Sequence, residues 1–392
     1  MKVYIKGLNA CAMRREKLVQ YREFLAANDH TLVESPEVSD AILLWTCAFR
    51  ADHRDSSLEQ IRYYLDNYNA KVVVTGCLPD IAPESIDFNP DRVVVANWKE
   101  DIKKLDDAFL PGRSLATFRV VYTEERLCED AALYRRSNPG KDATFHDQFN
   151  KILVSEGCNF KCSYCSERLA FPLYRSIPLE ELYAECLKKC HETGVYDVIL
   201  LADSLGQYGN DIGTDFPSLI RKLATVHPNM RFAFNNLHLS SFLEFIGEMK
   251  SFIADGLIKH LNLPIQSGSD KILRRMNRLY TKGDVEMVFG LLNSLGFKAF
   301  DTHILVGFPG ETEADFDETL DILTRYRPQY ALVSKYMESL NAPSAKLSDK
   351  VDDETVWRRL RRIENLLSDA GIICNCDGSE LSTNRIARLK QV

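Results

Sequence analysis

Short apolar runs alternate with helical patterns through the first hundred residues. Helical periodicity covers residues 14–27 and 56–68, in the two intervals between the first three apolar runs. Because strands that alternate with helices pair in parallel, we expect residues 1–118 to form a Rossmann-like parallel α/β domain. Four runs rich in β-branched or aromatic residues predict its strands, namely KVYI from Lys2, AILLW from Ala41, KVVV from Lys71 and RVVVA from Arg92.

The alternation resumes after an irregular, charged segment. Residues 119–146 are expected to be a linker, with Cys128 as a plain thiol within it. Residues 147–346 supply six strand candidates separated by helical segments, which predicts a (β/α)6 partial barrel. Residues 347–392 are expected to add one helix and a short polar tail. The six barrel candidates are KILV, DVILLAD, RFAFN, KHLNLPI, FDTHILV and YALVSKY.

Composition suggests a compartment and a use for the cysteines. The 392-residue chain has a formal net charge of −7, which gives no general attraction to nucleic acid but leaves room for local basic patches. No apolar run approaches the roughly 18 residues of a membrane span, and the first residues do not resemble a signal peptide. We therefore expect a cytoplasmic protein with no membrane partner. Eleven cysteines in a reducing compartment favour metal ligation or redox chemistry over disulfides.

Each of the first three predicted strands runs into a cysteine within a few residues. These are Cys11, Cys47 and Cys77. Open parallel sheets bind ligands outside the carboxyl ends of their strands, so the three thiols are expected to meet at one edge of the sheet. A single buried cysteine is more often a core residue. Three successive placements at strand ends predict a shared metal site instead.

A second group of cysteines follows the first barrel strand directly. The stretch SEGCNFKCSYCSER places Cys158, Cys162 and Cys165 in the spacing C-x3-C-x2-C. Structural zinc needs four ligands, and no second C-x2-C pair follows. Ferredoxin clusters use C-x2-C runs with a fourth cysteine. Three thiolates on a four-iron cluster leave one iron open to a small molecule.

This loop, with Tyr164 before its last cysteine, resembles the signature of radical S-adenosylmethionine (SAM) enzymes. In that family the open iron binds the methionine part of SAM, and an electron from the cluster releases a 5′-deoxyadenosyl radical. The strand-end cysteines in WTCAFR and VVVTGC narrow the resemblance to the methylthiotransferases. LADSLGQYG, LNLPIQSGSDKILRRMNRLYT and ILVGFPGETEADFDETLDIL are also similar to that family. The resemblance covers roughly residues 1–345.

The methylthiotransferase resemblance implies two [4Fe-4S] clusters and a defined reaction. Cys158, Cys162 and Cys165 would hold the SAM-cleaving cluster, and Cys11, Cys47 and Cys77 an auxiliary cluster that carries the sulfur. A second SAM would donate the methyl group, so that C–H becomes C–SCH3. A flavodoxin- or ferredoxin-like protein would supply electrons. The cofactors carry this chemistry, and the protein positions them.

The resemblance also suggests SAM contacts, each with a plainer alternative. Gln266 and Ser267 end the LNLPI strand, where the family contacts SAM, and the plainer alternative is a capping Ser-Gly-Ser turn. Gly/Pro loops are usually turns into a helix, and the run KILRRMNR reads as a solvated helix face unless one arginine pairs with the SAM carboxylate. Cys186 and Cys190, four apart on a helix, are expected to face the core. Cys374 and Cys376 receive no assigned role. The remaining candidate SAM or substrate contacts are Tyr164, Asp203, Tyr208, Arg274, Gly307, Pro309, Gly310 and Glu311.

Departures from the family pattern bear on the substrate. The tail shows no strands of the C-terminal TRAM module that members acting on tRNA or a ribosomal protein usually carry. Trp45-Thr46 stands where an asparagine-threonine pair is usual. The RRLRR run near the C-terminus is expected to be a solvated helix face. On these grounds a peptide, protein or small-molecule substrate is preferred, with tRNA as the alternative. Sulfur insertion without methylation also stays open, as do the rival classes of electron-transfer and zinc-binding protein.

Overall fold

The structure is a computed structural model that describes residues 1–8, 12–118 and 149–377, with the side chains of residues 12–16 left out. The chain folds into two compact units. The first draws its described residues from Met1–Val121, Tyr164–Pro172 and Met337–Ala345. The second draws them from Tyr122–Ser163, Leu173–Tyr336 and Lys346–Val392. The loop with three cysteines is therefore divided between the units after Ser163.

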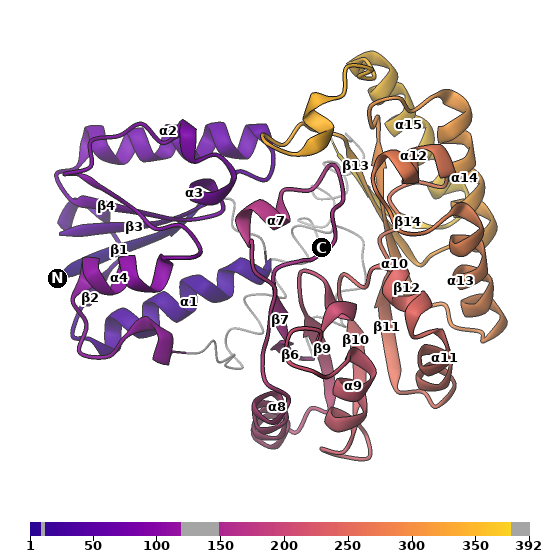
Figure 1. Ribbon diagram of the computed structural model, residues 1–392, viewed down its shortest axis with the longest axis horizontal. Helices are drawn as coiled ribbons and strands as arrows, with labels where there is room; N and C mark the ends of the chain where they lie inside the picture. Colours follow the sequence, from indigo (N-terminus) through magenta and orange to yellow (C-terminus); the bar gives the residue numbers. More distant parts are fainter. Residues whose placement is uncertain (9–11, 119–148, 378–392) are drawn as a thin grey trace, which may run out of the picture. The chain divides into compact units, whose positions relative to one another are not determined.

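The first unit contains a five-stranded parallel sheet in the order β2-β1-β3-β4-β5 (Figure 1). All four predicted strands are present, and the short strand β2 is an addition that the sequence pattern did not predict. Because the order changes direction between β1 and β3, this is the doubly wound arrangement of the flavodoxin type. The strands are β1 (Lys2–Gly7), β2 (Thr31–Val33), β3 (Ala41–Thr46), β4 (Lys71–Gly76) and β5 (Val93–Val95).

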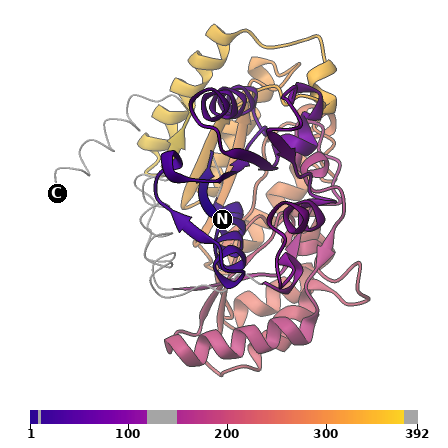
Figure 2. The same cartoon turned by 90° about the vertical axis from the view of Figure 1, so that its left-hand side faces the viewer.

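Alternate side chains of the central strand β3 enter two separate cores. Ile42 and Leu44 pack in the core under α2 (Ala51–Asn67) and α3 (Leu78–Ile81). Leu43 and Trp45 pack in the core under α1 (Ala12–Ala27) and α4 (Asp101–Phe109). Figure 2 views this unit from its N-terminal side, with helices on both faces of the sheet. Covering both faces explains why β3 is a continuous apolar run.

The second unit contains a seven-stranded sheet in the order β14-β13-β12-β11-β10-β9-β6, and all its strand pairs are parallel. The six predicted strands are confirmed. Strand β14 was not predicted, and it joins β13 through the predicted C-terminal helix, so the tail adds a further strand–helix unit to the open barrel. The strands are β6 (Asn150–Leu153), β9 (Asp197–Leu201), β10 (Arg231–Phe234), β11 (Ile258–Asn262), β12 (Phe300–Val306), β13 (Tyr330–Lys335) and β14 (Ile373–Cys376).

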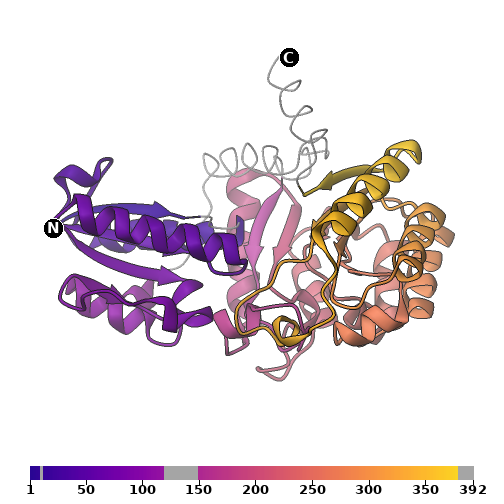
Figure 3. The same cartoon turned by 90° about the horizontal axis from the view of Figure 1, so that it is seen from above.

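Helices cover the outer face of this sheet, and Figures 1 and 3 show the orange-to-yellow ones lying along it. The largest core lies between these helices and the outward side chains of the strands, including Val198, Leu200, Phe232 and Phe234. Among the described helices, none is both long and apolar enough to cross a membrane. The helices of this unit are α8 (Leu179–Thr193), α9 (Phe216–Ala224), α10 (Leu239–Glu244), α11 (Ile246–Ala254), α12 (Asp270–Arg275), α13 (Lys282–Ser294), α14 (Glu313–Tyr326) and α15 (Asp353–Asp369).

Candidate functional site

Cys47 and Cys77 stand at equivalent positions on neighbouring strands of the first unit. Thr46 is in register with Gly76, and each cysteine is the next residue along its strand. The backbone N–H of Cys77 donates to the carbonyl oxygen of Thr46 at 2.8 Å. Neighbouring strands lie about 4.8 Å apart, so the two thiols start from adjacent points of one sheet edge. Cys11, the third predicted ligand, lies outside the described residues.

A glycine makes this close approach of β3 and β4 possible. Gly76 has a φ of +97°, and a Cβ there would lie 2.3 Å from the carbonyl oxygen of Thr46 and 2.7 Å from its nitrogen. Both neighbours are backbone atoms, which no side-chain rotation can remove. The sequence VTGC therefore requires glycine directly before Cys77.

Cys47 has polar neighbours on α2. Its sulfur lies 3.5 Å from Nδ1 of His53, and its carbonyl oxygen accepts a 2.8 Å hydrogen bond from the hydroxyl of Ser57. Burial raises the pKa of the Cys47 thiol, although the backbone N–H of Phe49 acts in the opposite direction. Cys77 is buried as well. Because this sheet edge is shielded from solvent, a nearby cation or a metal ion would be needed to stabilise the thiolate forms of the two cysteines.

The first part of the cysteine loop is held by two residues of the segment that follows β9 in the second unit. The backbone N–H of Gly157 donates to Oδ2 of Asp203 at 2.7 Å. The backbone N–H of Asn159 donates to Oε1 of Gln207 at 2.9 Å. Asp203 therefore has a structural partner in the loop, in addition to any contact with a ligand.

The other side of the loop is held from the segment after α12. The backbone N–H of Ser163 donates to the carbonyl oxygen of Met276 at 2.9 Å, and the side-chain amide of Asn277 donates to the carbonyl oxygen of Lys161 at 2.7 Å. Asn277 has a φ of 56°, which ends the helical path and turns the chain inward. These contacts hold the Lys161 and Ser163 backbone on either side of Cys162.

Arg278 follows this turn and reaches the loop sulfur. It is 9% exposed, and its Nη1 lies 3.2 Å from the sulfur of Cys162 as a hydrogen-bond donor. Arg274, the arginine predicted to contact SAM, is exposed instead. Arg275 pairs with Asp349 at 2.6 Å. The KILRRMNR run is thus only in part a solvated helix face, and its last arginine is a functional candidate that the pattern did not single out.

Tyr164 and Cys165 belong to the first unit. Helix α7 (Glu167–Ala170), which follows Cys165, packs against α3, which begins directly after Cys77. The Glu167 carboxylate is also close enough to Cys47 to raise the pKa of its thiol. The backbone N–H of Glu167 lies 3.4 Å from the Cys165 sulfur. Within the first unit, the chain that carries Cys165 therefore lies beside the edge that carries Cys47 and Cys77.

The donor set fits iron–sulfur ligation. The described cysteines are all free of disulfides, and N–H groups are directed at the sulfurs of Cys162 and Cys165. Soft thiolates are the ligands that iron–sulfur clusters take, and hydrogen bonds to the sulfur are typical of such sites. Among the described residues, no three side chains of His, Cys, Asp and Glu already form a metal-binding group. The two cysteine triplets therefore stay predictions as ligand sets.

Two predicted SAM contacts, Gln266 and Ser267, lie in the turn after strand β11. Gln266 has a φ of 68°, and its backbone is fixed to β12 by bonds to His303 and Leu305. A non-glycine residue in this region is strained, and such strain gathers at functional sites. Ser267 is fully buried, with its hydroxyl 3.4 Å from that of Thr319. Its hydroxyl therefore supports the turn.

Tyr208 is a core residue in this structure. Its side chain is fully buried, and its hydroxyl donates to the carbonyl oxygen of Ile177 at 2.9 Å. Burial raises its pKa to about 12. The hydroxyl is therefore a neutral donor that already has a partner.

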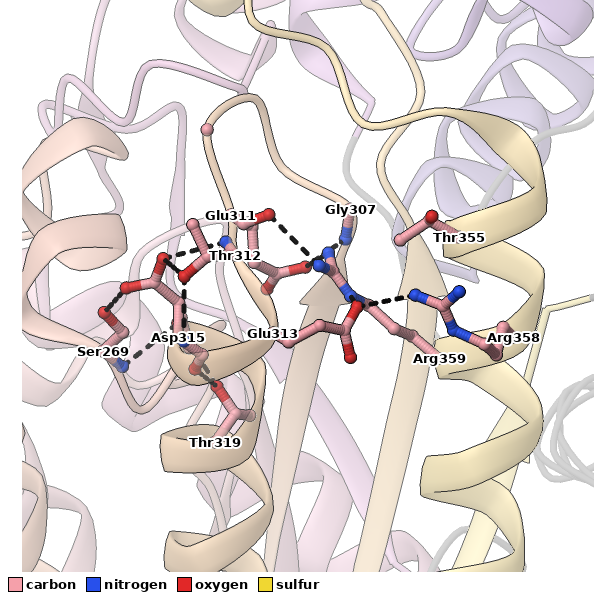
Figure 4. Close-up of polar contacts among 12 residues, drawn as sticks. Ser269, Gly307, Glu311, Thr312, Glu313, Asp315, Thr319, Thr355, Arg358 and Arg359 are labelled. Carbon is pink, nitrogen blue, oxygen red and sulfur yellow. Dashed lines mark hydrogen bonds and ion pairs between the residues drawn. The ribbon is translucent and has the colours of Figure 1, made fainter.

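The loop after β12 is fixed by a buried ion pair (Figure 4). The backbone N–H of Gly307 donates to Oε2 of Glu311 at 2.7 Å, and Nη1 of Arg359 on α15 lies 2.9 Å from the same oxygen. Pro309 accepts a 3.0 Å hydrogen bond from Arg275 at its carbonyl oxygen. Gly310 donates its N–H to the carbonyl oxygen of Asp349 at 2.7 Å. Loop GFPGE is thus a supported turn whose backbone path depends on the C-terminal helix.

The RRLRR run of α15 is largely an inter-helix contact. Arg358 and Arg359 both donate to Glu313 at 2.9 Å, and Arg362 pairs with Asp317 at 2.7 Å. The acidic partners lie on α14, as Figure 4 shows for Glu313. The expectation of a solvated helix face is therefore wrong for Arg359, which is 3% exposed, and these arginines have partners other than phosphate.

A histidine beside the cysteine loop was not predicted. The ring of His238, which follows β10, stacks on Phe160 with a centroid distance of 3.8 Å. Burial and the Arg278 charge lower its pKa to about 2. Its Nε2 is buried without a hydrogen-bond partner, and Ser204 after β9 has a buried hydroxyl in the same condition. Orphaned polar atoms at two adjacent strand ends are compatible with a bound ligand.

The predicted core role of Cys186 and Cys190 agrees with their burial. Their sulfurs lie 4.0 Å apart on α8. Cys376 is buried on β14 and Cys374 is half-buried beside it. Cys128 lies outside the described residues.

Two family profiles match the chain. The radical SAM superfamily matches residues 152–323, and Uncharacterized protein family UPF0004 matches residues 2–96. A probable threonylcarbamoyladenosine tRNA methylthiotransferase from Pyrococcus horikoshii is 30% identical over 348 residues, covering 88% of this chain and 79% of that protein. A tRNA-2-methylthio-N(6)-dimethylallyladenosine synthase from Thermoanaerobacter sp. is 36% identical over 378 residues, covering 91% and 76%.

Solved structures show the same fold at low identity. The radical S-adenosylmethionine methyltransferase TsrM from Kitasatospora setae, with cobalamin and a [4Fe-4S] cluster bound, superposes with a TM-score of 0.62 at 13% identity. The match covers 97% of this chain and 94% of that one. This likeness concerns the fold alone. The sequence similarity over most of its length shows that this chain belongs to the radical SAM methylthiotransferase family, whose members use SAM and two [4Fe-4S] clusters.

Proposed function

We propose that this protein is a methylthiotransferase that acts on tRNA and replaces a C–H bond of a modified adenosine with C–SCH3. The proposal is supported by relatives named as tRNA methylthiotransferases, which match about nine tenths of the chain. The preference for a peptide, protein or small-molecule substrate gives way here to the alternative, because the relatives favour tRNA.

One packing observation supports the proposed type of reaction. The segment with Cys165 packs within the first unit beside the sheet edge of Cys47 and Cys77 through α7 and α3. A radical step and a sulfur-transfer step need their cysteine sets close together, because the substrate carbon must reach the sulfur. This arrangement supports both sets serving one reaction.

Each set has a proposed cofactor. Cys158, Cys162 and Cys165 would hold the SAM-cleaving cluster, and Cys11, Cys47 and Cys77 the auxiliary one. When bound, the clusters supply electron transfer to SAM and a sulfur for the substrate, with methyl transfer from a second SAM. A flavodoxin- or ferredoxin-like protein is the proposed reductant.

In this proposal, side chains of the protein hold the cysteine loop and the turns that would contact SAM. Asp203 and Gln207 hold the start of the loop through its backbone N–H groups. Gln266 and Ser267 fix the turn after β11, where we place a SAM contact. The backbone of Gly307 and Pro309 would line the adenine side, since the Glu311–Arg359 pair holds that loop.

The substrate is tested with cluster-reconstituted, reduced enzyme under anaerobic conditions. Reactions contain SAM and either adenosine-modified tRNA or a peptide library, and products are read by mass spectrometry. We expect roughly eight irons per chain for two four-iron clusters, and SCH3 gained by a nucleoside of the tRNA. Zinc in place of iron, or SCH3 on peptides alone, would refute the proposal. Binding of tRNA should weaken steeply with salt.

A matched variant controls for the structural effect of removing a cysteine. Cys186→Ala removes a buried thiol of α8 outside both sets. It should keep the iron content and the product, whereas Cys47→Ala should lose about half of the iron.

A further inference from the structure

Arg278 makes contacts that a surface arginine does not. Its Nη1 lies 3.2 Å from the sulfur of Cys162. Its Nη2 donates to the carbonyl oxygen of Pro264 at 2.7 Å, and its Nε donates to the hydroxyl of Tyr280 at 2.8 Å. All three guanidinium nitrogens are therefore engaged, and the planar fork is fixed in one orientation.

The partners of Arg278 are themselves rigid. Tyr280 is buried, and its hydroxyl donates to the carbonyl oxygen of Ile265 at 2.9 Å. Pro264 and Ile265 lie just after β11, at the turn that contains the strained Gln266. The guanidinium thus links the end of β11 to the cysteine loop. A full positive charge in this position, 9% exposed, is weakly screened by solvent.

The geometry points to Arg278 as a positioning residue that orients Cys162 and raises the reduction potential of the iron–sulfur cluster on the loop. Reduction adds negative charge to the cluster, so a fixed cation and an N–H donor on a ligand sulfur favour the reduced form. This inference rests on the proposed function, because it needs Cys162 to be a cluster ligand.

The same contacts separate Arg278 from a general role in folding. The two earlier arginines of the run are placed differently. Arg275 bonds to Asp349 and to the Pro309 carbonyl oxygen, and the side chain of Arg274 is exposed. A purely structural Arg278 would affect how much cluster is retained. A residue that acts on the sulfur affects the potential of the cluster that is retained.

The test measures a potential rather than activity. All proteins carry Cys47→Ala and Cys77→Ala, so that only the loop cluster is present. Spectroelectrochemical titration gives the midpoint potential for Arg278, Arg278→Lys and Arg278→Met, and electron paramagnetic resonance follows the reduced cluster. We expect Arg278→Met to shift the reduction equilibrium about tenfold toward the oxidised form, which is 59 mV more negative for one electron. Arg278→Lys keeps the charge without the fork and should shift it less.

Two further variants keep the test decisive. Arg221→Met removes an exposed arginine of α9 and should leave the potential unchanged. Tyr280→Phe removes the hydroxyl that accepts from Nε of Arg278 and donates to the Ile265 carbonyl oxygen, while the guanidinium itself is kept. It serves if Arg278→Met does not fold, with a smaller negative shift expected. Wild-type potentials and spectra in Arg278→Met, or in Tyr280→Phe if only that variant folds, would overturn the inference. Absence of iron from the parent protein would instead overturn the proposed function.

Discussion

Removal of the Arg359 cation is expected to have a cost that depends on pH. The side chains of Glu311 and Arg359 are 2% and 3% exposed, and their charged atoms lie 2.9 Å apart. Burial raises the pKa of Glu311 to about 7, although the Gly307 N–H and Arg359 act to lower it. The folded protein therefore holds a proton on Glu311 below about pH 7 and an ion pair above it.

The raised pKa of Glu311 determines the direction in which stability changes with pH. A carboxyl group with a folded pKa above its unfolded value of about 4.3 stabilises the fold at low pH, and this stability is lost as the pH rises to the folded pKa. In the native protein the loss ends near pH 7, where Glu311 ionises beside Arg359. In Arg359→Met the pKa of Glu311 rises further, so the loss continues at about 1.4 kcal/mol per pH unit.

Arg359→Met should lower the free energy of unfolding by different amounts at low and at high pH. Near pH 6 the variant loses hydrogen bonds to a neutral carboxyl group and should be about 1–3 kcal/mol less stable. Near pH 9 the carboxylate has lost its buried partner, and the deficit should reach about 3–5 kcal/mol. The difference between the two pH values is the informative quantity, because other effects of the substitution cancel in it.

Urea unfolding of cluster-free protein with a thiol reductant, followed by far-ultraviolet circular dichroism, measures both values. Arg358→Met is the control on the same helix, since Arg358 is 60% exposed in its ion pair with Glu313. It should change stability by less than about 0.5 kcal/mol at either pH. An Arg359→Met deficit that is equal at about pH 6 and pH 9 would refute the charge state assigned to Glu311.

Two other substitutions test the strand edges. Gly76→Ala should destabilise the first unit by about 2–4 kcal/mol in urea unfolding, because its Cβ would meet the Thr46 backbone at 2.3 Å. The control Gly213→Ala, at a φ of +73° with open space around it, should lower stability by only about 1–2 kcal/mol. Equal losses of stability in the two variants would contradict the clash at Gly76. His238 stays neutral, since burial and Arg278 lower its pKa to about 2. The unfolded chain takes up a proton below about pH 6.5, so native stability falls by about 1.4 kcal/mol per unit there. His238→Gln removes this loss, and its stability relative to the native protein should improve by about 2 kcal/mol between about pH 6.5 and 5; parallel pH profiles would be the contrary result.

The sequence pattern was sufficient for strands that are buried on both faces. AILLW became β3 because every side chain of that strand is covered. The two unpredicted strands, β2 and β14, have three and four residues with half-buried patterns. Such short edge strands form because a neighbour offers hydrogen bonds, and a single-chain pattern does not contain that neighbour.

In the candidate site, too, local features could be predicted from the sequence, and contacts between distant residues could not. The spacing of Cys158, Cys162 and Cys165 is local, so the chain itself displays it. The contact between Arg278 and Cys162 joins residues 116 positions apart. Nothing in KILRRMNR distinguishes Arg278 from Arg274 until the left-handed residue Asn277 turns the chain inward.

The central claim is that two cysteine sets perform separate steps of one reaction. Its most direct test is a single quenched reaction with SAM, reductant and tRNA, in which 5′-deoxyadenosine and the tRNA nucleosides are quantified together. Cys77→Ala should still release 5′-deoxyadenosine but yield no methylthio nucleoside, while Cys162→Ala should yield neither. Methylthio product from Cys77→Ala at the native rate, or 5′-deoxyadenosine from Cys162→Ala, would contradict the account.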